Sequence, residues 1–196
     1  MSMLRAFIAI EIPPALHERI AAESAALQKD LAQAVRWVRP QNIHLTLKFL
    51  GDTSPASLEN LAHALGGVAA RQMPFQIEVG GFGLFPNSKR PRILWIGIQS
   101  PPDLEQLQRA IESTCARLGY PLEGKPFSPH LTIGRLREEA ALGPALQEIR
   151  IGQIGSLRVE NLTLFRSDLH PQGPIYTALA QIPLAQTHSQ NQRGEP

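Results

Sequence analysis

Runs of apolar residues typical of buried strands alternate along this chain with apolar stripes at helical spacing. The first run, 4–11, predicts a strand, and the proline pair after it stops the strand and opens a helix with an apolar stripe from Leu16 to Leu31. Ser54 and Pro55 predict the start of a second helix, and Asp103 that of a third. Further strands are predicted over 35–38, 43–50, 75–79, 92–98, 130–135, 156–165 and 175–182, and a weaker helix over 139–149.

These elements follow one another without a linker or a low-complexity boundary. That continuity favours one α+β domain of two similar lobes over 1–185. The polar tail, 186–196, has no apolar anchor, and we expect it to be poorly ordered. A connection rich in Gly, Pro and Asn, 80–91, is expected to be a mobile loop, and its basic residues Lys89 and Arg90 lie near its end.

The composition is that of a globular chain that can bury a core: of 196 residues, 43% are hydrophobic and 18% are charged. A formal net charge of +2 is small for a protein that coats long nucleic acid, so any contact with nucleic acid should be local. The single cysteine, Cys115, excludes an internal disulfide and a cysteine-based zinc site. The apolar run between Arg5 and Glu11 is too short for a signal peptide, and no run is long enough for a transmembrane helix. We expect a cytoplasmic protein without a membrane partner.

One tetrapeptide occurs twice, as HLTL over 44–47 and as HLTI over 130–133, and the two copies are 86 positions apart (130 − 44). Each copy lies in a predicted strand, where side chains alternate between two faces. His44 and Thr46 therefore share one face, as do His130 and Thr132, while the apolar residues turn to the core. A single His-x-Thr in a strand is commonplace, but two copies in comparable halves of the chain indicate a function.

Two imidazoles facing one substrate can hold opposite protonation states and act as base and acid in one step, which is what metal-free phosphodiester cleavage needs. A threonine two residues along the strand, about 6.5 to 7 Å away, can donate its hydroxyl to a non-bridging phosphate oxygen. Thr46 and Thr132 are placed for this role. From the residues alone, the acid and base roles of the two histidines are interchangeable.

The segments that contain the repeat, RWVRPQNIHLTLKFLG and PFSPHLTIGR, resemble the two-histidine phosphoesterases, and among these the RNA 2′,3′-cyclic phosphodiesterases, also called 2′-5′ RNA ligases. GGFGLFPNSKRPRILWIGI and LFRSDLHPQGPIYTAL are similar to the same family, so the resemblance runs from about residue 4 to 184. It implies a bilobal α+β fold with two antiparallel sheets, outer helices, and His-x-Thr strands that line a central cleft. It further implies hydrolysis of RNA 2′,3′-cyclic phosphate ends to 2′-phosphomonoesters without metal or cofactor, with reversible 2′-5′ ligation as a further activity.

By position in that family, His44 is expected to be the proton donor to the leaving oxygen and His130 the proton acceptor. The resemblance also suggests substrate contacts at the fifth residue after each histidine, Phe49 and Arg135. In a regular strand, the odd offset would place both side chains on the face opposite the histidines. Gly134, however, favours a bulge that would turn Arg135 back to their face.

Two further candidates for substrate contact come from position alone, and both have an ordinary explanation as solvated residues. Lys48 shares the face of His44 by strand parity, and Arg90 lies in a loop within reach of an RNA backbone. We expect the partner to be an RNA with a 2′,3′-cyclic phosphate end, such as a tRNA fragment, and the protein to be a monomer.

Three alternatives stay open. The protein can be a non-catalytic module that binds RNA ends, or a phosphodiesterase of small cyclic nucleotides. The histidines can also be metal ligands, but neither motif offers the three or four protein ligands that a metal site normally needs. Trp37, Trp95 and Cys115 have a sufficient explanation as core residues.

Overall fold

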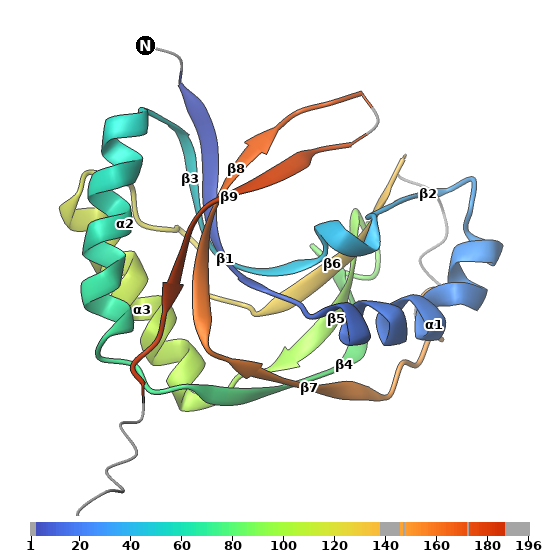
Figure 1. Ribbon diagram of the computed structural model, residues 1–196. Helices are drawn as coiled ribbons and strands as arrows, with labels where there is room; N and C mark the ends of the chain where they lie inside the picture. The colour runs from blue at the N-terminus through green and yellow to red at the C-terminus, as the bar shows by residue number, and fades with distance from the viewer. Residues whose placement is uncertain (1–2, 138–145, 147, 172, 187–196) are drawn as a thin grey trace, which may run out of the picture.

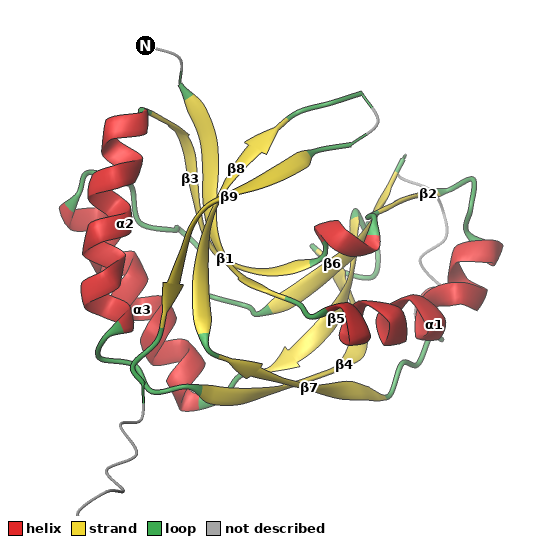
Figure 2. Cartoon of the chain, in the orientation of Figure 1, coloured by secondary structure: helices red, strands yellow, loops and turns green. Residues whose placement is uncertain are grey.

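The structure is a computed structural model that describes residues 3–137, 146, 148–171 and 173–186. Its strands and helices alternate in the order expected of an α+β fold, which confirms the predicted class (Figures 1 and 2). In chain order they are β1 (Leu4–Glu11), α1 (Pro14–Asp30), β2 (Val35–Trp37), the short 3-10 helix η1 (Pro40–Asn42), β3 (His44–Thr53), α2 (Pro55–Ala69), β4 (Phe75–Phe85), β5 (Ile93–Gln99), α3 (Pro102–Arg117), β6 (His130–Leu136), β7 (Gln153–Val159), β8 (Asn161–Asp168) and β9 (Ile175–Pro183).

The strands pair in the order β7-β4-β5-β6-β3-β1-β8-β9, with β2 added beside β6, and the pairings are antiparallel. The path consists of two four-stranded halves, β6-β5-β4-β7 and β3-β1-β8-β9. They meet at β3 and β6 through one pair, Leu45 with Leu131, and both side chains are fully buried. The two antiparallel sheets that the resemblance implies are thus joined at the two strands that carry the repeated tetrapeptide.

Corresponding strands pair in the same register within each half. Thr46 lies opposite Ala9 in β1, and Thr132 lies opposite Trp95 in β5. Both members of the second pair are 86 positions beyond those of the first (132 − 46 and 95 − 9), the same offset as between the tetrapeptides. The repeat therefore extends from the sequence to the pairing of the strands.

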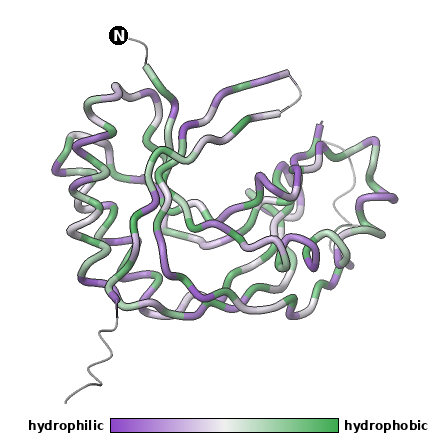
Figure 3. The backbone as a smooth tube through the Cα atoms, in the orientation of Figure 1, coloured by the Kyte–Doolittle hydropathy of each residue, from purple (hydrophilic) through white to green (hydrophobic). Residues whose placement is uncertain are grey.

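Helices α1 and α3 pack across the two halves (Figure 1). Helix α1 follows β1 but packs against β7 of the other half, and α3 follows β5 but packs against β3 and α2. Arg19 and Leu16 of α1 lie so close to β7 that a side chain at Gly155 would contact both. Apolar and polar stretches alternate along these elements (Figure 3), and their apolar side chains form one continuous core.

Several predicted boundaries need correction. The strand predicted over 75–79 continues to Phe85, so the first half of the expected mobile loop is strand and the connection is shorter. The strand predicted over 156–165 is two strands in different halves, and the chain crosses from one half to the other at Glu160. Ser54 caps α2 as predicted, since its Oγ accepts from the backbone N–H of Ser57 at 3.1 Å. Most of the helix predicted over 139–149, and the tail from 187, lie outside the described residues.

Candidate active site

Strands β3 and β6 bring the two repeated tetrapeptides side by side. The Leu45–Leu131 pair is antiparallel, and its register places His44 across from Thr132 and Thr46 across from His130. The leucines point into the core, so the histidines and threonines point to the opposite face, where all four are partly exposed. Residues from distant parts of the chain thus form one cluster of two imidazoles and two hydroxyls.

The two imidazoles are oriented in the same way. Nδ1 of His44 lies 2.8 Å from the carbonyl oxygen of Asn42, and Nδ1 of His130 lies 2.8 Å from that of Ser128. A carbonyl oxygen only accepts, so each Nδ1 carries the proton and donates it. In the neutral ring this leaves Nε2 as a proton acceptor, and in the charged ring as a donor.

Burial lowers the pKa of both rings. Burial, which acts against the hydrogen bond to Asn42 and together with the nearby His130, lowers the pKa of His44 to about 4. Burial also lowers the pKa of His130 below 6.5, although the hydrogen bond to Ser128 acts to raise it. The positive charge of Arg135 adds to the lowering. Because both pKa values lie below 6.5, the neutral form of each ring predominates in the free protein at pH 7.

Aromatic side chains surround His44. Phe7 of β1 stacks on its ring with the centroids 4.7 Å apart, and Tyr176 of β9 meets it edge-on at 5.2 Å. Phe165 of β8 stacks on Phe7 in turn, at 5.2 Å. This packing accounts for the burial of the ring. Burial also raises the pKa of Tyr176, so its hydroxyl stays protonated and can donate a hydrogen bond.

His130 has its own aromatic neighbours. Phe85, at the end of β4, meets its ring edge-on with the centroids 4.9 Å apart, and Trp95 of β5 lies 6.3 Å away. The core explanation for Trp95 is therefore incomplete, because its ring also borders the site. Sequence reasoning missed Phe85 and the three aromatics at His44, since single aromatic residues in strands carry no signal that separates a site from a core.

A bulge in β3 turns Phe49 toward the site. Lys48 pairs with Ile8 and Thr46 pairs with Ala9, so Leu47 has no partner and the alternation of faces shifts by one. Phe49 therefore returns to the face of the histidines, where it is 62% exposed. Its ring lies 6.3 Å from that of Phe7. The objection from strand parity does not hold for this residue.

The equivalent bulge lies in β6. Gly134 pairs with Leu94 and Thr132 pairs with Trp95, so Ile133 is the extra residue, as the glycine indicated. Arg135 is thereby turned to the exposed face, and its charge acts on the pKa of His130. The fifth residues after the two histidines thus lie on the face of the site, one an aromatic ring and the other a guanidinium.

This duplicated arrangement has counterparts among known proteins. A family model of LigT-like phosphoesterases matches the chain twice in succession, over residues 10–95 and 96–176. The chain belongs to the LigT-like phosphoesterase family. The first match contains His44 and the second contains His130.

Curated relatives in the LigT-like family are named RNA 2′,3′-cyclic phosphodiesterase. The protein of Methanothermobacter thermautotrophicus is 34% identical over 89% of this chain and 95% of its own length. That of Aquifex aeolicus is 34% identical over 93% of this chain and 98% of its own length.

Solved structures of the family have the same fold. Escherichia coli LigT in its apo form superposes with a TM-score of 0.79 at 31% identity, covering 95% of this chain and 100% of that chain. E. coli LigT complexed with 3′-AMP gives a TM-score of 0.76 at 30% identity, covering 94% and 99%.

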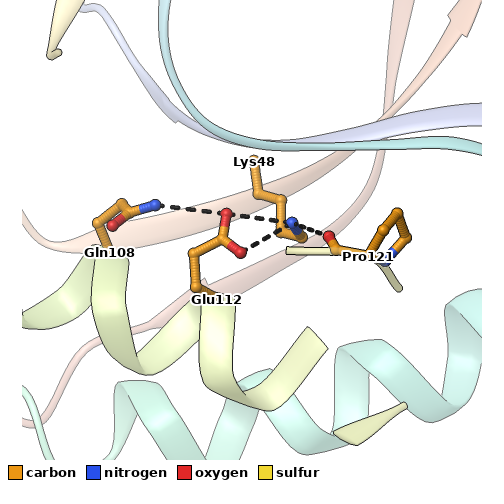
Figure 4. Close-up of polar contacts among 4 residues, drawn as sticks. All are labelled: Lys48, Gln108, Glu112 and Pro121. Carbon is orange, nitrogen blue, oxygen red and sulfur yellow. Dashed lines mark hydrogen bonds and ion pairs between the residues drawn. The ribbon is translucent and has the colours of Figure 1, made fainter. Parts of the chain in front are cut away.

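Lys48 does not lie where the sequence predicted (Figure 4). The bulge that exposes Phe49 turns Lys48 to the opposite face, where its side chain is 1% exposed. Its Nζ donates to both carboxylate oxygens of Glu112 in α3, at 3.0 and 2.9 Å, and to the carbonyl oxygen of Pro121 at 2.8 Å. The prediction of a substrate contact is wrong for Lys48, which ties β3 to α3 and to the segment that leads into β6.

Arg90 lies in the exposed turn between β4 and β5. Its backbone N–H donates to Oδ1 of Asn87 at 3.1 Å, as does that of Lys89 at 3.0 Å. Neither His44 nor His130 is among the described contacts of Arg90, so its role toward substrate stays a prediction.

A pocket of about 290 Å³ opens beside His44. Its walls combine polar, aromatic and aliphatic residues: Glu11, Ile12, His17, Gln41, Asn42, Ile43, His44, Phe165 and Tyr176. Within the described part of the chain, no three His, Cys, Asp or Glu side chains are grouped as a metal site would need, and no helix is both long and apolar enough to cross a membrane.

Proposed function

We propose that this chain hydrolyses the 2′,3′-cyclic phosphate at the end of an RNA to a 2′-phosphomonoester, with His44 and His130 as the acid and base. The observation that carries the proposal is the pairing of two His-x-Thr strands whose rings both present Nε2 on one face. The names of the relatives support the choice of substrate, because they are called RNA 2′,3′-cyclic phosphodiesterase.

In the proposed reaction, Nε2 of neutral His130 accepts a proton from water as the water oxygen attacks phosphorus. The bond from phosphorus to the 3′ oxygen breaks, and Nε2–H of protonated His44 gives its proton to that oxygen. His130 ends protonated and His44 neutral, and exchange with solvent restores both. A 5′-hydroxyl in place of water would give a 2′-5′ linkage through the same transfers.

The electrostatics of the free protein suit the base role of His130, whereas the acid role of His44 requires that substrate binding raise its lowered pKa. His130 needs to be neutral to act as a base, and both burial and the charge of Arg135 lower its pKa. His44 must gain a proton on binding, and a phosphodiester anion beside its ring favours the charged form. In the proposed complex, the hydroxyls of Thr46 and Thr132 donate to the non-bridging oxygens and Arg135 neutralises the charge that develops there.

The terminal nucleoside has two candidate contacts near His44. Phe49 is exposed beside Phe7 and can stack on a base, and stacking of this kind is worth about 1–3 kcal/mol per base. The pocket that Gln41 and Asn42 help to line offers amide groups to the same nucleoside.

The experiment uses an oligonucleotide with a 2′,3′-cyclic phosphate end, in the presence of a chelator, with identification of the phosphate position in the product. We expect a 2′-phosphate and a bell-shaped pH profile. His44→Ala and His130→Ala should each lower kcat by about 10²- to 10⁴-fold. His63→Ala, at an exposed position of α2, is the matched control. Full activity of either site variant, or RNA binding without turnover, would overturn the proposal.

A second substrate separates the two roles. In a nitrophenyl phosphodiester the leaving group departs without a proton, so a general acid is dispensable while a base is still needed. We expect His44→Ala to retain most of the wild-type rate on this substrate and His130→Ala to lose it. The reverse result would exchange the roles and leave the paired mechanism in place.

A further inference from the structure

Two arginines lie directly opposite each other beside the site. The short strand β2 pairs with β6, and in its register Arg36 is the partner of Arg135. Both residues are exposed. Like charges directly opposite in an antiparallel pair are destabilising, and their side chains start about 4.5–5.5 Å apart. This pair is therefore unfavourable unless an anion lies between or beside the two guanidinium groups.

Both arginines are on the face of the histidines. The neighbours of Arg36 along β2, Val35 and Trp37, cover Gly134 from the core side: a Cβ at Gly134 would lie 2.6 Å from Cγ1 of Val35 and 3.3 Å from the ring of Trp37. Because alternate residues of a strand face opposite ways, Arg36 projects from the other side. The charge of Arg135 acts on the pKa of His130 and also on that of Tyr176 from the other half.

Arg36 is held in place by a backbone carbonyl oxygen. Its Nη2 donates to the carbonyl oxygen of Pro171, at 3.1 Å, in the connection between β8 and β9. Asn42 secures the same connection by donating to the carbonyl oxygen of Pro174 at 2.8 Å. Among the described residues, neither Arg36 nor Arg135 forms an ion pair with a carboxylate. A guanidinium has five N–H donors, so Arg36 retains several for an anion.

We infer that Arg36 binds a second phosphate of the substrate, the one on the 5′ side of the terminal nucleotide. This inference rests on the proposed function, in which Arg135 contacts the reacting cyclic phosphate. A guanidinium next to Arg135 on the same face is placed for the adjacent phosphate of the same strand, and its fork of donors fits phosphate oxygens. The substrate class is then an RNA end whose terminal nucleotide is joined to another, in preference to an isolated cyclic nucleotide.

The test removes the charge from the second phosphate in one arm and from Arg36 in the other. Two dinucleotides ending in a 2′,3′-cyclic phosphate are compared, one with a normal phosphodiester linkage and one with an uncharged methylphosphonate linkage. We expect the wild-type protein to prefer the charged linkage by about 10- to 100-fold in kcat/KM, the range for a hydrogen bond to a charged group. In Arg36→Gln this ratio should fall close to one. Arg71→Gln, at an exposed position after α2, should keep the wild-type ratio and rate.

The outcomes separate this inference from the function on which it rests. Equal wild-type rates on the two dinucleotides, or an unchanged ratio in Arg36→Gln, would overturn the second-phosphate site while hydrolysis itself stands. If the wild-type protein hydrolyses neither dinucleotide nor a cyclic mononucleotide, the proposed function fails instead. A thermal unfolding curve of Arg36→Gln checks that an altered ratio does not come from a misfolded variant.

Discussion

Titration of His44 tests the electrostatics of the site most directly. Burial lowers the pKa of this ring from 6.5 to about 4, which corresponds to about 3 kcal/mol in favour of its neutral form. In a two-dimensional NMR titration of the free protein, we expect the chemical shifts of the His44 ring to stay those of a neutral imidazole from pH 8 to below pH 5. A His44 ring that titrates at or above pH 6.5 would refute the reasoning.

The same shift has a consequence for stability. An unfolded chain binds a proton at His44 below about pH 6.5, whereas the folded chain does so only near pH 4, so between these values the unfolded state holds more protons. The free energy of unfolding therefore falls as the pH is lowered through this window, and His44 accounts for up to about 3 kcal/mol of the loss. Urea unfolding at pH 7, 6 and 5 should show a smaller loss in His44→Gln than in the wild type. Equal pH slopes in the two proteins would contradict the shift.

Binding of an anion should reverse the shift. Inorganic phosphate next to the ring favours the charged form, so the pKa of His44 should rise on saturation with phosphate. By linkage, phosphate must then bind more tightly as the pH is lowered from the pKa of the complex toward that of the free ring, about 4. The measurement is the same NMR titration with and without phosphate, and His44→Gln should lose this part of the pH dependence. Phosphate that binds but leaves the His44 titration in place would mean that the anion sits elsewhere.

Three further predictions concern the frame of the site. Lys48→Met should lower the free energy of unfolding by about 3–5 kcal/mol, because it leaves the carboxylate of Glu112 without its ion-pair partner. Adding Glu112→Leu should restore most of this loss. Urea unfolding measures both variants, and additive losses would contradict a buried pair. Gly134→Ala should cost about 1–3 kcal/mol in thermal unfolding because its Cβ would overlap a core side chain, and a neutral result would place β2 differently. Thr46→Val and Thr132→Val should each lower kcat by about 10²-fold or more without loss of stability, and unchanged rates would remove the threonines from the reaction.

The sequence was sufficient to predict the central cluster because the repeat and the alternation of strand faces are both written in it. Two His-x-Thr copies in apolar strands place one imidazole and one hydroxyl of each copy away from the core, wherever the strands lie. The class of fold followed from the alternation of elements. The resemblance implied only that the two His-x-Thr strands line one cleft. The direct pairing of β3 with β6 is seen in the structure alone, since strand order is a long-range property that no local pattern encodes.

The bulges are the main reason why the rest could not be predicted. A single unpaired residue, Leu47, exchanges the faces of Lys48 and Phe49, and parity arguments applied along an unbroken strand assign both to the wrong side. In β6 a glycine marked the equivalent position, but in β3 nothing in the sequence does. The partner of Lys48 was equally hidden, because Glu112 lies 64 residues away in α3, the helix between β5 and β6 of the other half.

The duplicated fold makes the two halves of the site alike, whereas the proposed reaction needs the two histidines to play different roles. A repeat with one register in both halves gives two histidines with the same Nδ1 bond and the same flanking threonine, so the framework alone cannot distinguish acid from base. The distinction must come from residues that differ between the copies, and the bulges supply them by turning Phe49 to the site in one half and Arg135 in the other. A cation on one side and an aromatic ring on the other can orient a substrate that has a phosphate at one end and a base at the other. Exchanging the two side chains in a Phe49→Arg/Arg135→Phe variant should therefore impair the reaction more than it impairs folding, because it keeps the symmetric framework and reverses only what gives it direction.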